Sequence, residues 1–231
     1  MIVWLASYPR SGSHYLRVLL RYGFGLSCPP GYGIAPHVPE QRRSAPRLEL
    51  WDADVPETPE AMRASPRRWY VKTHDLPTDD APALYLVRDG RDAVVSFAHY
   101  LIETRDPAAA GRSFAEVLGD LVESDVAFGG WSTNVTAWID RDASTTLLRF
   151  EDLVCAADPL AVVHDALERM GVRDLAPRSY EVPDFATLRR SQPRNFRTGE
   201  IRGFEREMPP ALAERFWQRH GGTLARLGYE P

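Results

Sequence analysis

The chain has 231 residues, and its contents of 44% hydrophobic and 26% charged residues are ordinary for a soluble globular protein. A formal net charge of −4 argues against a protein that binds nucleic acid mainly through its phosphates, so any anion site must be a local concentration of basic side chains. Cys28 and Cys155 provide neither a disulfide framework nor a zinc signature, and the N-terminal apolar run is far shorter than a membrane span. We therefore predict one domain over residues 1–231, cytoplasmic, with no metal and no membrane span.

Short apolar strands alternate with helical segments along the chain. In chain order we predict a strand at 2–6, a helix at 15–22, a loop rich in glycine and proline at 23–46, a short helix at 56–64, strands at 69–73 and 83–87, helices at 93–103, 113–123 and 131–140, a strand at 145–150, helices at 158–170 and 183–191, a basic turn-rich tract at 192–206 and a final helix at 209–227. This alternation predicts the α/β fold class, with a central parallel sheet and helices on both of its faces.

The most informative segment is the turn between the first strand and the first helix, Ser7–Arg17. A strand, a tight turn with glycine and hydroxyl side chains, and then a helix form the geometry that holds a phosphate, because the first N–H groups of the helix lack partners. Arg10 adds a full positive charge there. The turn is not a Walker A motif, because no lysine follows Gly12, and this disfavours an ATPase or kinase.

Two further strand ends carry basic side chains. Lys72, the only lysine of the chain, and His74 end the second strand, while Arg88 and Arg91 follow the third. Ligands of parallel sheets bind beyond the carboxyl ends of the strands. If these strands are neighbours, we expect the basic groups to converge with Arg10 in one crevice, where they would suit a ligand with phosphates at two separate places.

The first loop, Tyr8–Tyr15, resembles the Y-P-K-S-G-T-[TS]-W loop of the cytosolic-type sulfotransferases that depend on PAPS (3′-phosphoadenosine 5′-phosphosulfate). Lys72–Pro77 resembles their K-T-H-L-P segment, and Tyr85–Ser96 their Y-x-x-R-[ND]-P-[KR]-D-x-x-x-S segment. Phe150–Leu153 is similar to their Y-E-D-[LM] strand end, and Phe196–Phe204 to their R-K-G-x-x-G-[DE]-[WF] loop. The matches follow the family order over nearly the whole chain, and they imply a P-loop-type three-layer fold.

The resemblance also implies roles for individual residues in sulfuryl transfer. Lys72 would stabilise the bridging oxygen, His74 would accept the proton of the acceptor hydroxyl, and Arg10 would stabilise charge at the 5′-phosphate. The implied residues of the nucleotide site are Arg10, Ser11, Gly12, Ser13, His14, Tyr15, Arg88, Ser96, Phe150, Arg197, Thr198 and Gly199. PAPS would be the co-substrate and PAP (3′-phosphoadenosine 5′-phosphate) the product, with no metal and no covalent intermediate.

Several positions depart from the family pattern. Arg10 stands where the family has a lysine, and a guanidinium fork is not a point charge. Tyr15 replaces a tryptophan that stacks on adenine, and Phe150 lacks the usual tyrosine hydroxyl. In the last loop Thr198 replaces a lysine and Asn195 a phenylalanine.

The expected acceptor is a small molecule with a hydroxyl or phenol group. The compact length and arginine-rich composition resemble bacterial sulfotransferases that tailor natural products. The least motif-like segments, Gly23–Pro46, Leu101–Arg112 and the C-terminal tract, are the predicted acceptor walls. No nucleic-acid partner is expected, and no feature indicates an oligomer.

Two other hypotheses stay open. A P-loop nucleotide kinase with a degenerate loop would need Mg²⁺ and ATP, and a non-catalytic nucleotide-binding module would have no evident use for Lys72 and His74. Taken singly, His14 and His99 are interpreted as structural, and the aromatic residues at helical spacings as core rather than ligand contacts; these are Trp131, Trp138, Phe216 and Trp217.

Overall fold

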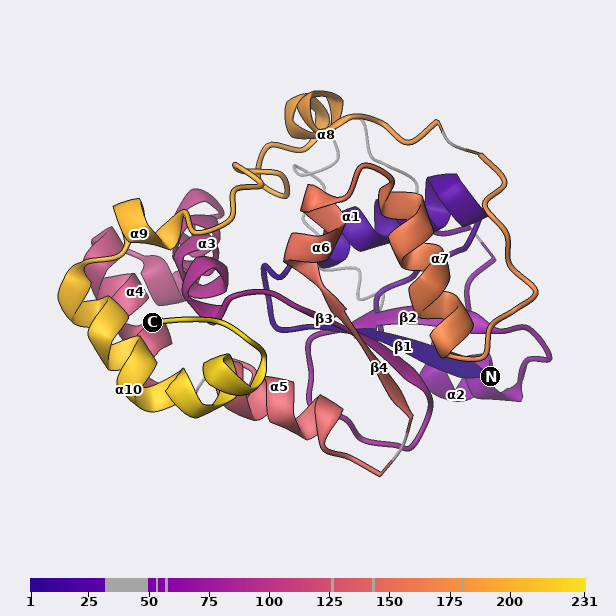
Figure 1. Ribbon diagram of the computed structural model, residues 1–231, viewed down its shortest axis with the longest axis horizontal. Coiled ribbons are helices and arrows are strands. Elements are labelled where there is room, and N and C mark those ends of the chain that lie inside the picture. Colours follow the sequence, from indigo (N-terminus) through magenta and orange to yellow (C-terminus); the bar gives the residue numbers. More distant parts are fainter. Residues whose placement is uncertain (32–49, 53, 57, 126, 143, 180) are drawn as a thin grey trace.

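The computed structural model describes residues 1–231 except 32–49, 53, 57, 126, 143 and 180, and it contains a four-stranded parallel sheet (Figure 1). The strands are β1 (Ile2–Ala6), β2 (Trp69–Thr73), β3 (Ala83–Val87) and β4 (Thr145–Arg149), in the order β2-β1-β3-β4. The four predicted strands are confirmed, except that β4 ends one residue early because Phe150 begins a helix. β1 is central and pairs with both β2 and β3.

Side chains alternate between two faces of the sheet, and each face is covered by helices (Figure 1). Trp4 and Tyr85 belong to the core on one face, and Leu5 and Leu84 to the core on the other. The first core is completed by α3 (Gly90–Glu103), α4 (Phe114–Glu123), α5 (Trp131–Ile139) and α10 (Pro210–Arg226). The second is completed by α1 (Ser13–Val18), the π-helical segment Leu19–Gly23, α6 (Phe150–Cys155) and α7 (Pro159–Arg169). The predicted three-layer α/β arrangement is confirmed.

The remaining helices of the described residues are α2 (Pro59–Ala64), α8 (Phe185–Ser191), α9 (Phe204–Glu207) and a short 3₁₀ turn, Pro107–Ala109. Side-chain caps set several boundaries: Asp158 accepts from two N–H groups of α7, and Ser113 forms a capping box with Glu116. The helix predicted at 93–103 begins three residues earlier, at Gly90, because Asp89 accepts from the N–H of Arg91 at 2.9 Å. Helix α6 was not predicted from the sequence.

The segment that follows the first helix runs along the outer edge of β2. The N–H of Lys72 donates to the carbonyl of Pro29 (2.8 Å), and the N–H of Gly31 donates to the carbonyl of Lys72 (2.7 Å). This part of the predicted loop at 23–46 therefore extends the sheet edge locally. Residues 32–46 of that loop lie outside the described residues.

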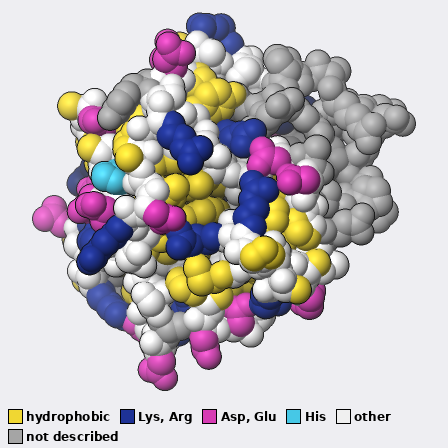
Figure 2. All heavy atoms as spheres, turned by 90° about the vertical axis from the view of Figure 1, so that its right-hand side faces the viewer, with side chains coloured by type: hydrophobic (Ala, Val, Ile, Leu, Met, Phe, Trp, Pro, Cys, Tyr) yellow, Lys and Arg dark blue, Asp and Glu magenta, His cyan; other side chains and the backbone are white. Residues whose placement is uncertain are grey.

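Surface arginines are mostly paired with carboxylates. Arg63 pairs with Asp79 and Arg226 with Asp140, each at 2.5 Å. On the face shown in Figure 2, basic and acidic side chains are interspersed rather than separated by sign. Among the described residues, no helix is long and apolar enough to cross a bilayer.

The predicted aromatic core is confirmed for Trp131, Trp138 and Phe216, which are buried, while Trp217 is half-buried against the same core. His220 lies among these rings, 4.4 Å from Phe216 between ring centres, with its Nδ1 2.7 Å from the hydroxyl of Ser132. Burial lowers the pKa of His220 to about 4. The ring is therefore neutral in the folded protein at pH 5, where the unfolded chain would carry the proton.

Acid should consequently destabilise the fold through His220. Between its ordinary pKa near 6.5 and about 4 the unfolded state binds more protons, so this residue should lower the free energy of unfolding by about 1.4 kcal/mol per pH unit as the pH falls. Urea unfolding measured from pH 7.5 to 4.5 should show a shallower pH slope in His220→Phe than in the wild type. Equal slopes would contradict the assignment.

Candidate functional site

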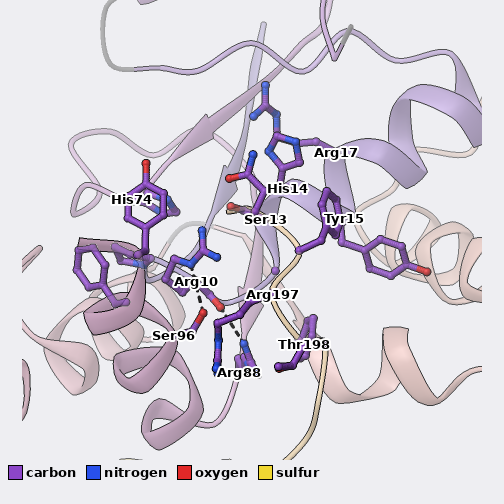
Figure 3. A pocket seen from close by; sticks show the side chains of 18 of the residues that line it. Arg10, Ser13, His14, Tyr15, Arg17, His74, Arg88, Ser96, Arg197 and Thr198 are labelled. Atoms are coloured by element: carbon purple, nitrogen blue, oxygen red, sulfur yellow. Dashed lines mark hydrogen bonds between the residues drawn. The ribbon is translucent and has the colours of Figure 1, made fainter. Parts of the chain in front are cut away.

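A cavity of about 580 Å³ opens at the carboxyl end of the sheet (Figure 3). The strand order brings together the three predicted strand ends, because β1 lies between β2 and β3. The predicted site residues that line the cavity are Arg10, Gly12, Ser13, His14, Tyr15, Lys72, His74, Arg88, Ser96, Phe150, Arg197, Thr198 and Gly199. Ser11 does not line it, but its Oγ is buried with no hydrogen-bond partner.

The loop between β1 and α1 is held in a left-handed backbone conformation. Gly12 has φ +96° and Arg10 φ +67°, and the N–H of Ser11 donates to the carbonyl of Tyr8 at 3.3 Å. No side chain caps α1 at Gly12, so the first N–H groups of this helix remain available for an anion. Only a glycine fits, because a Cβ at position 12 would lie 2.4 Å from Phe150.

Arg10 reaches across the cavity toward α3 (Figure 3). Its Nε donates to the hydroxyl of Ser96 at 3.3 Å, and its Nη2 donates to the carbonyl of Arg194 at 2.7 Å. The guanidinium lies 4.8 Å from the ring centre of Tyr100. Burial lowers the pKa of Arg10 to about 10, so it is charged at neutral pH.

His74 is fixed in one tautomer. Its Nδ1 lies 2.7 Å from the carbonyl oxygen of Ser7, which can only accept, so Nδ1 carries the proton and Nε2 keeps its lone pair. Burial, reinforced by the charge of Lys72, lowers the pKa of His74 well below its ordinary value. The ring is therefore neutral at pH 7, as a proton acceptor must be.

Asn134 on α5 fixes the backbone beneath His74. Its Nδ2 donates to the carbonyl of His74 at 2.9 Å, while its Oδ1 accepts from the Tyr85 hydroxyl at 2.8 Å. Asn134 is fully buried, and it was not among the predicted site residues. No local sequence signal marks its contacts with Tyr85 and His74, which are 49 and 60 residues away; its third partner, the carbonyl of Phe128, is six residues away.

Arg88 and Arg197 form a second group of cations, below Arg10 in Figure 3. Arg88 donates to the carbonyls of Arg10 (3.2 Å) and Glu200 (2.8 Å), and its Nε is buried without a partner. Arg197 forms a bidentate pair with Glu207 at 2.8 and 2.9 Å, and its Nε is likewise buried without a partner. Two buried N–H donors without acceptors indicate an anion subsite at this end of the cavity.

The expected convergence of Arg91 with these cations is wrong. Its guanidinium pairs with Asp89 at 2.8 Å and donates to the carbonyl of Glu230 at 2.6 Å. The helix that starts at Gly90 turns the side chain of Arg91 away from the cavity, against Phe204.

His14 and His99, the two histidines interpreted as structural, differ in whether they line the cavity. His14 lines the cavity with its ring edge on Phe196, and burial lowers its pKa to about 3. His99 does not line it; its Nε2 lies 2.7 Å from Glu207, the carboxylate that also holds Arg197.

Apolar and aromatic side chains complete the cavity lining, and Phe128 packs against the ring of His74 at 5.7 Å between ring centres. Leu101 and Asp106 come from the predicted acceptor segment at 101–112, whereas the sequence did not single out Phe97, Tyr100 and Phe128. Arg17 also lines the cavity and was not predicted to do so, although it stands one helical turn after Ser13 and so shares its helix face. Within the described part of the chain, no group of three or more His, Cys, Asp or Glu side chains could hold a metal ion.

A parallel α/β sheet with a glycine turn at the first strand end and cations at the next two is the arrangement of a P-loop-type fold. The family model described as "Sulfotransferase domain" matches residues 2–227, and the chain belongs to this family.

The chain is 27% identical over 158 residues to mouse Sulfotransferase 1B1, a match that covers 62% of this chain and 50% of the mouse protein. It thus spans about half the length of the curated relative. Mouse sulfotransferase SULT7A1, solved in complex with PAP, superposes with a TM-score of 0.64 at 19% identity over 96% of this chain and 83% of that one. Retinol dehydratase, in complex with androsterone and inactive cofactor PAP, superposes with a TM-score of 0.62 at 16% identity, over 96% of this chain and 80% of that one.

Replacing Gly12 should damage this loop. In Gly12→Ala the side chain would be strained at φ +96° and would collide with Phe150, so we expect a loss of about 1–3 kcal/mol in the free energy of unfolding. Gly119→Ala is the matched control, because its Cβ would meet nothing within 4 Å inside α4, and it should stabilise by about 0.5–1 kcal/mol. Denaturant unfolding measures both; equal effects would contradict the tight fit at Gly12.

Proposed function

We propose that this chain is a sulfotransferase that moves the sulfuryl group of PAPS to a hydroxyl or phenol group of a small molecule. The observation that carries the proposal is the position of His74, whose Nδ1 lies 2.7 Å from the carbonyl oxygen of Ser7, beside Lys72 at the end of β2 and next to the anion loop of β1. Membership of the sulfotransferase family and the PAP bound in two similar structures support it.

The residues present suit a ligand with two separate phosphates. At one end, the buried Nε donors of Arg88 and Arg197, together with Ser96, would hold the 3′-phosphate. Arg10 and the backbone N–H groups of the glycine loop would hold the 5′-phosphate. The nearby side chains of Tyr15, Phe150 and Thr198, with the backbone of Gly199, also line the cavity and would enclose the nucleotide.

The proposed reaction is a direct in-line displacement. The acceptor oxygen forms a bond to sulfur as the bond from sulfur to the bridging phosphate oxygen breaks, and its proton passes to Nε2 of His74. Lys72 would stabilise the charge that develops on the bridging oxygen of the departing PAP. The pair is placed for this by the sheet, since alternate residues of β2 and of the turn that follows it face one cavity.

The acceptor would occupy the wall on the side of His74. Phe128 lies against His74, and Phe97, Tyr100 and Leu101 add further apolar lining to the cavity, which suits an aromatic or alicyclic body carrying the reacting hydroxyl. Androsterone, which is bound in the retinol dehydratase complex, has a size and polarity of this kind. The closer resemblance to enzymes that tailor natural products stays a prediction, as do the cytoplasmic location and the single domain over residues 1–231.

Calorimetric titration with PAP tests the nucleotide. We expect PAP to bind without Mg²⁺, because the site consists of arginines, a lysine and backbone donors. We expect the main effect of Arg88→Ala to be weaker binding of PAP. Binding of ATP with Mg²⁺ and no response to PAP would contradict the proposal and favour the nucleotide kinase.

Replacing His74 tests the base. His74→Ala should lower transfer from PAPS by about 10²–10⁴-fold while PAP affinity stays within about twofold of the wild type. Because the pKa of His74 is lowered, kcat/KM of the wild type should stay level as the pH falls through 6.5 and decline only at more acidic pH.

The control is His164→Ala, a histidine on α7 outside the cavity, which should leave transfer unchanged. Unchanged turnover in His74→Ala would remove that residue from the base role. No turnover in the wild type with any hydroxyl acceptor, despite tight PAP binding, would favour the non-catalytic module.

A further inference from the structure

Arg17 is a charged side chain that lines the cavity and has no role in the function proposed above, because it belongs neither to the two phosphate subsites nor to the His74–Lys72 pair. It lies on α1, one turn after Ser13, and is only 6% exposed. Figure 3 shows it on the opposite side of Arg10 from Arg88 and Arg197. The cavity therefore has a basic group at an end that the two phosphate subsites do not reach.

The position of the Arg17 guanidinium is fixed by two contacts. Its Nε donates to the carbonyl of Cys28 at 2.8 Å, and its Cζ lies 5.2 Å from the ring centre of Trp51. The segment from Cys28 to Gly31 runs beside β2 and is hydrogen-bonded to the backbone of Lys72 on both sides. Arg17 is thereby anchored next to the Lys72 end of the cavity, where the reacting groups would meet.

One nitrogen of this guanidinium, Nη2, is buried and makes no hydrogen bond, and the described residues offer Arg17 no carboxylate partner. A buried charge with an unused donor is costly unless an anion completes it. Burial, and next to it the charge of Arg17, lowers the pKa of Lys72, so the two cations lie close enough to act on the same ligand. Burial lowers the pKa of Arg17 to about 10, so it is charged at neutral pH.

Arg10 does not fill this role. Its guanidinium is turned toward α3, where it donates to Ser96 and to the carbonyl of Arg194. Arg10 therefore serves the phosphate side of the cavity, while Arg17 brings a fork of donors to the Lys72 side.

We propose that Arg17 binds an oxygen of the transferred sulfuryl group through Nη2, as a second cation of the transfer site beside Lys72 and close to the glycine loop. This inference rests on the proposed function. PAP lacks the sulfuryl group and PAPS carries it, so Arg17 should contribute to the binding of PAPS and not to that of PAP. If the Arg17 guanidinium instead binds a negatively charged oxygen of the acceptor, the affinities of both PAP and PAPS will be unaffected by its replacement.

The test compares the affinities of PAP and PAPS in calorimetric titrations without acceptor. In Arg17→Gln we expect PAPS to bind about tenfold to a hundredfold more weakly, as for a lost hydrogen bond to a charged group, while PAP affinity changes by less than about twofold. Arg17→Lys keeps the charge but not the fork and should lose about threefold to tenfold in PAPS affinity alone. Arg21→Gln, on the next turn and paired with Asp52 outside the cavity, is the matched control and should change neither affinity.

The outcomes are distinguishable. Equal losses for both nucleotides would make Arg17 a structural anchor of the Cys28 segment and overturn the inference, as would PAPS affinities that do not change. If Arg17→Gln fails to fold, Arg17→Lys carries the test, and an unaltered ratio of PAPS to PAP affinity in that variant overturns the inference. A wild-type protein that binds neither nucleotide would instead refute the proposed function.

Discussion

The candidate site depends on how the fold buries several arginine side chains in a chain whose net charge is negative. Arg10, Arg17 and Arg88 enter one cavity, and each donates to backbone carbonyls: those of Arg194, Cys28, Arg10 and Glu200. A carbonyl dipole stabilises a guanidinium without cancelling its charge, whereas a carboxylate would compete with an incoming anion. Two arginines of the cavity also have a carboxylate nearby: Arg197 is held by Glu207, and Arg88 lies 3.7 Å from the buried carboxylate of Asp92. The surface arginines show the contrast, because carboxylates neutralise them.

This arrangement requires the central position of β1. Parallel strands on both sides of β1 place the turn after Ala6 between the ends of β2 and β3, so residues 60 to 80 positions apart in the sequence become neighbours. Gly12 lets the turn pass against the ring of Phe150, and Phe150 in turn supports the guanidinium of Arg88 at 4.5 Å. One glycine thus couples the two anion subsites through a shared aromatic ring.

The parallel sheet and the strand ends could be predicted because they depend on local apolar runs and on motif order. Lys72, His74 and Arg88 were located in this way. The direction of Arg91 was not predictable from its turn, because it depends on where α3 begins, and the cap at Asp89 sets that boundary. Asn134 was not predicted for a related reason. Its hydrogen bonds to Tyr85 and to the backbone of His74 form only when the tertiary fold brings these residues together. Arg17 carried a helical-spacing signal, but its burial depends on the distant Cys28 segment.

The cations also determine when His74 can accept a proton. Burial lowers the pKa of His74 the most, the charges of Lys72, Arg10 and Arg17 lower it further, and the hydrogen bond to Ser7 raises it. An anionic ligand bound among these cations would offset their charges at the imidazole, since Coulomb interactions at a few Å are strong in a buried site. The proton affinity of Nε2 would then rise upon binding of the sulfuryl donor. The site would thus hold a weak base when empty and a stronger one when the donor is in place, with no change in the geometry that Ser7 and Asn134 impose.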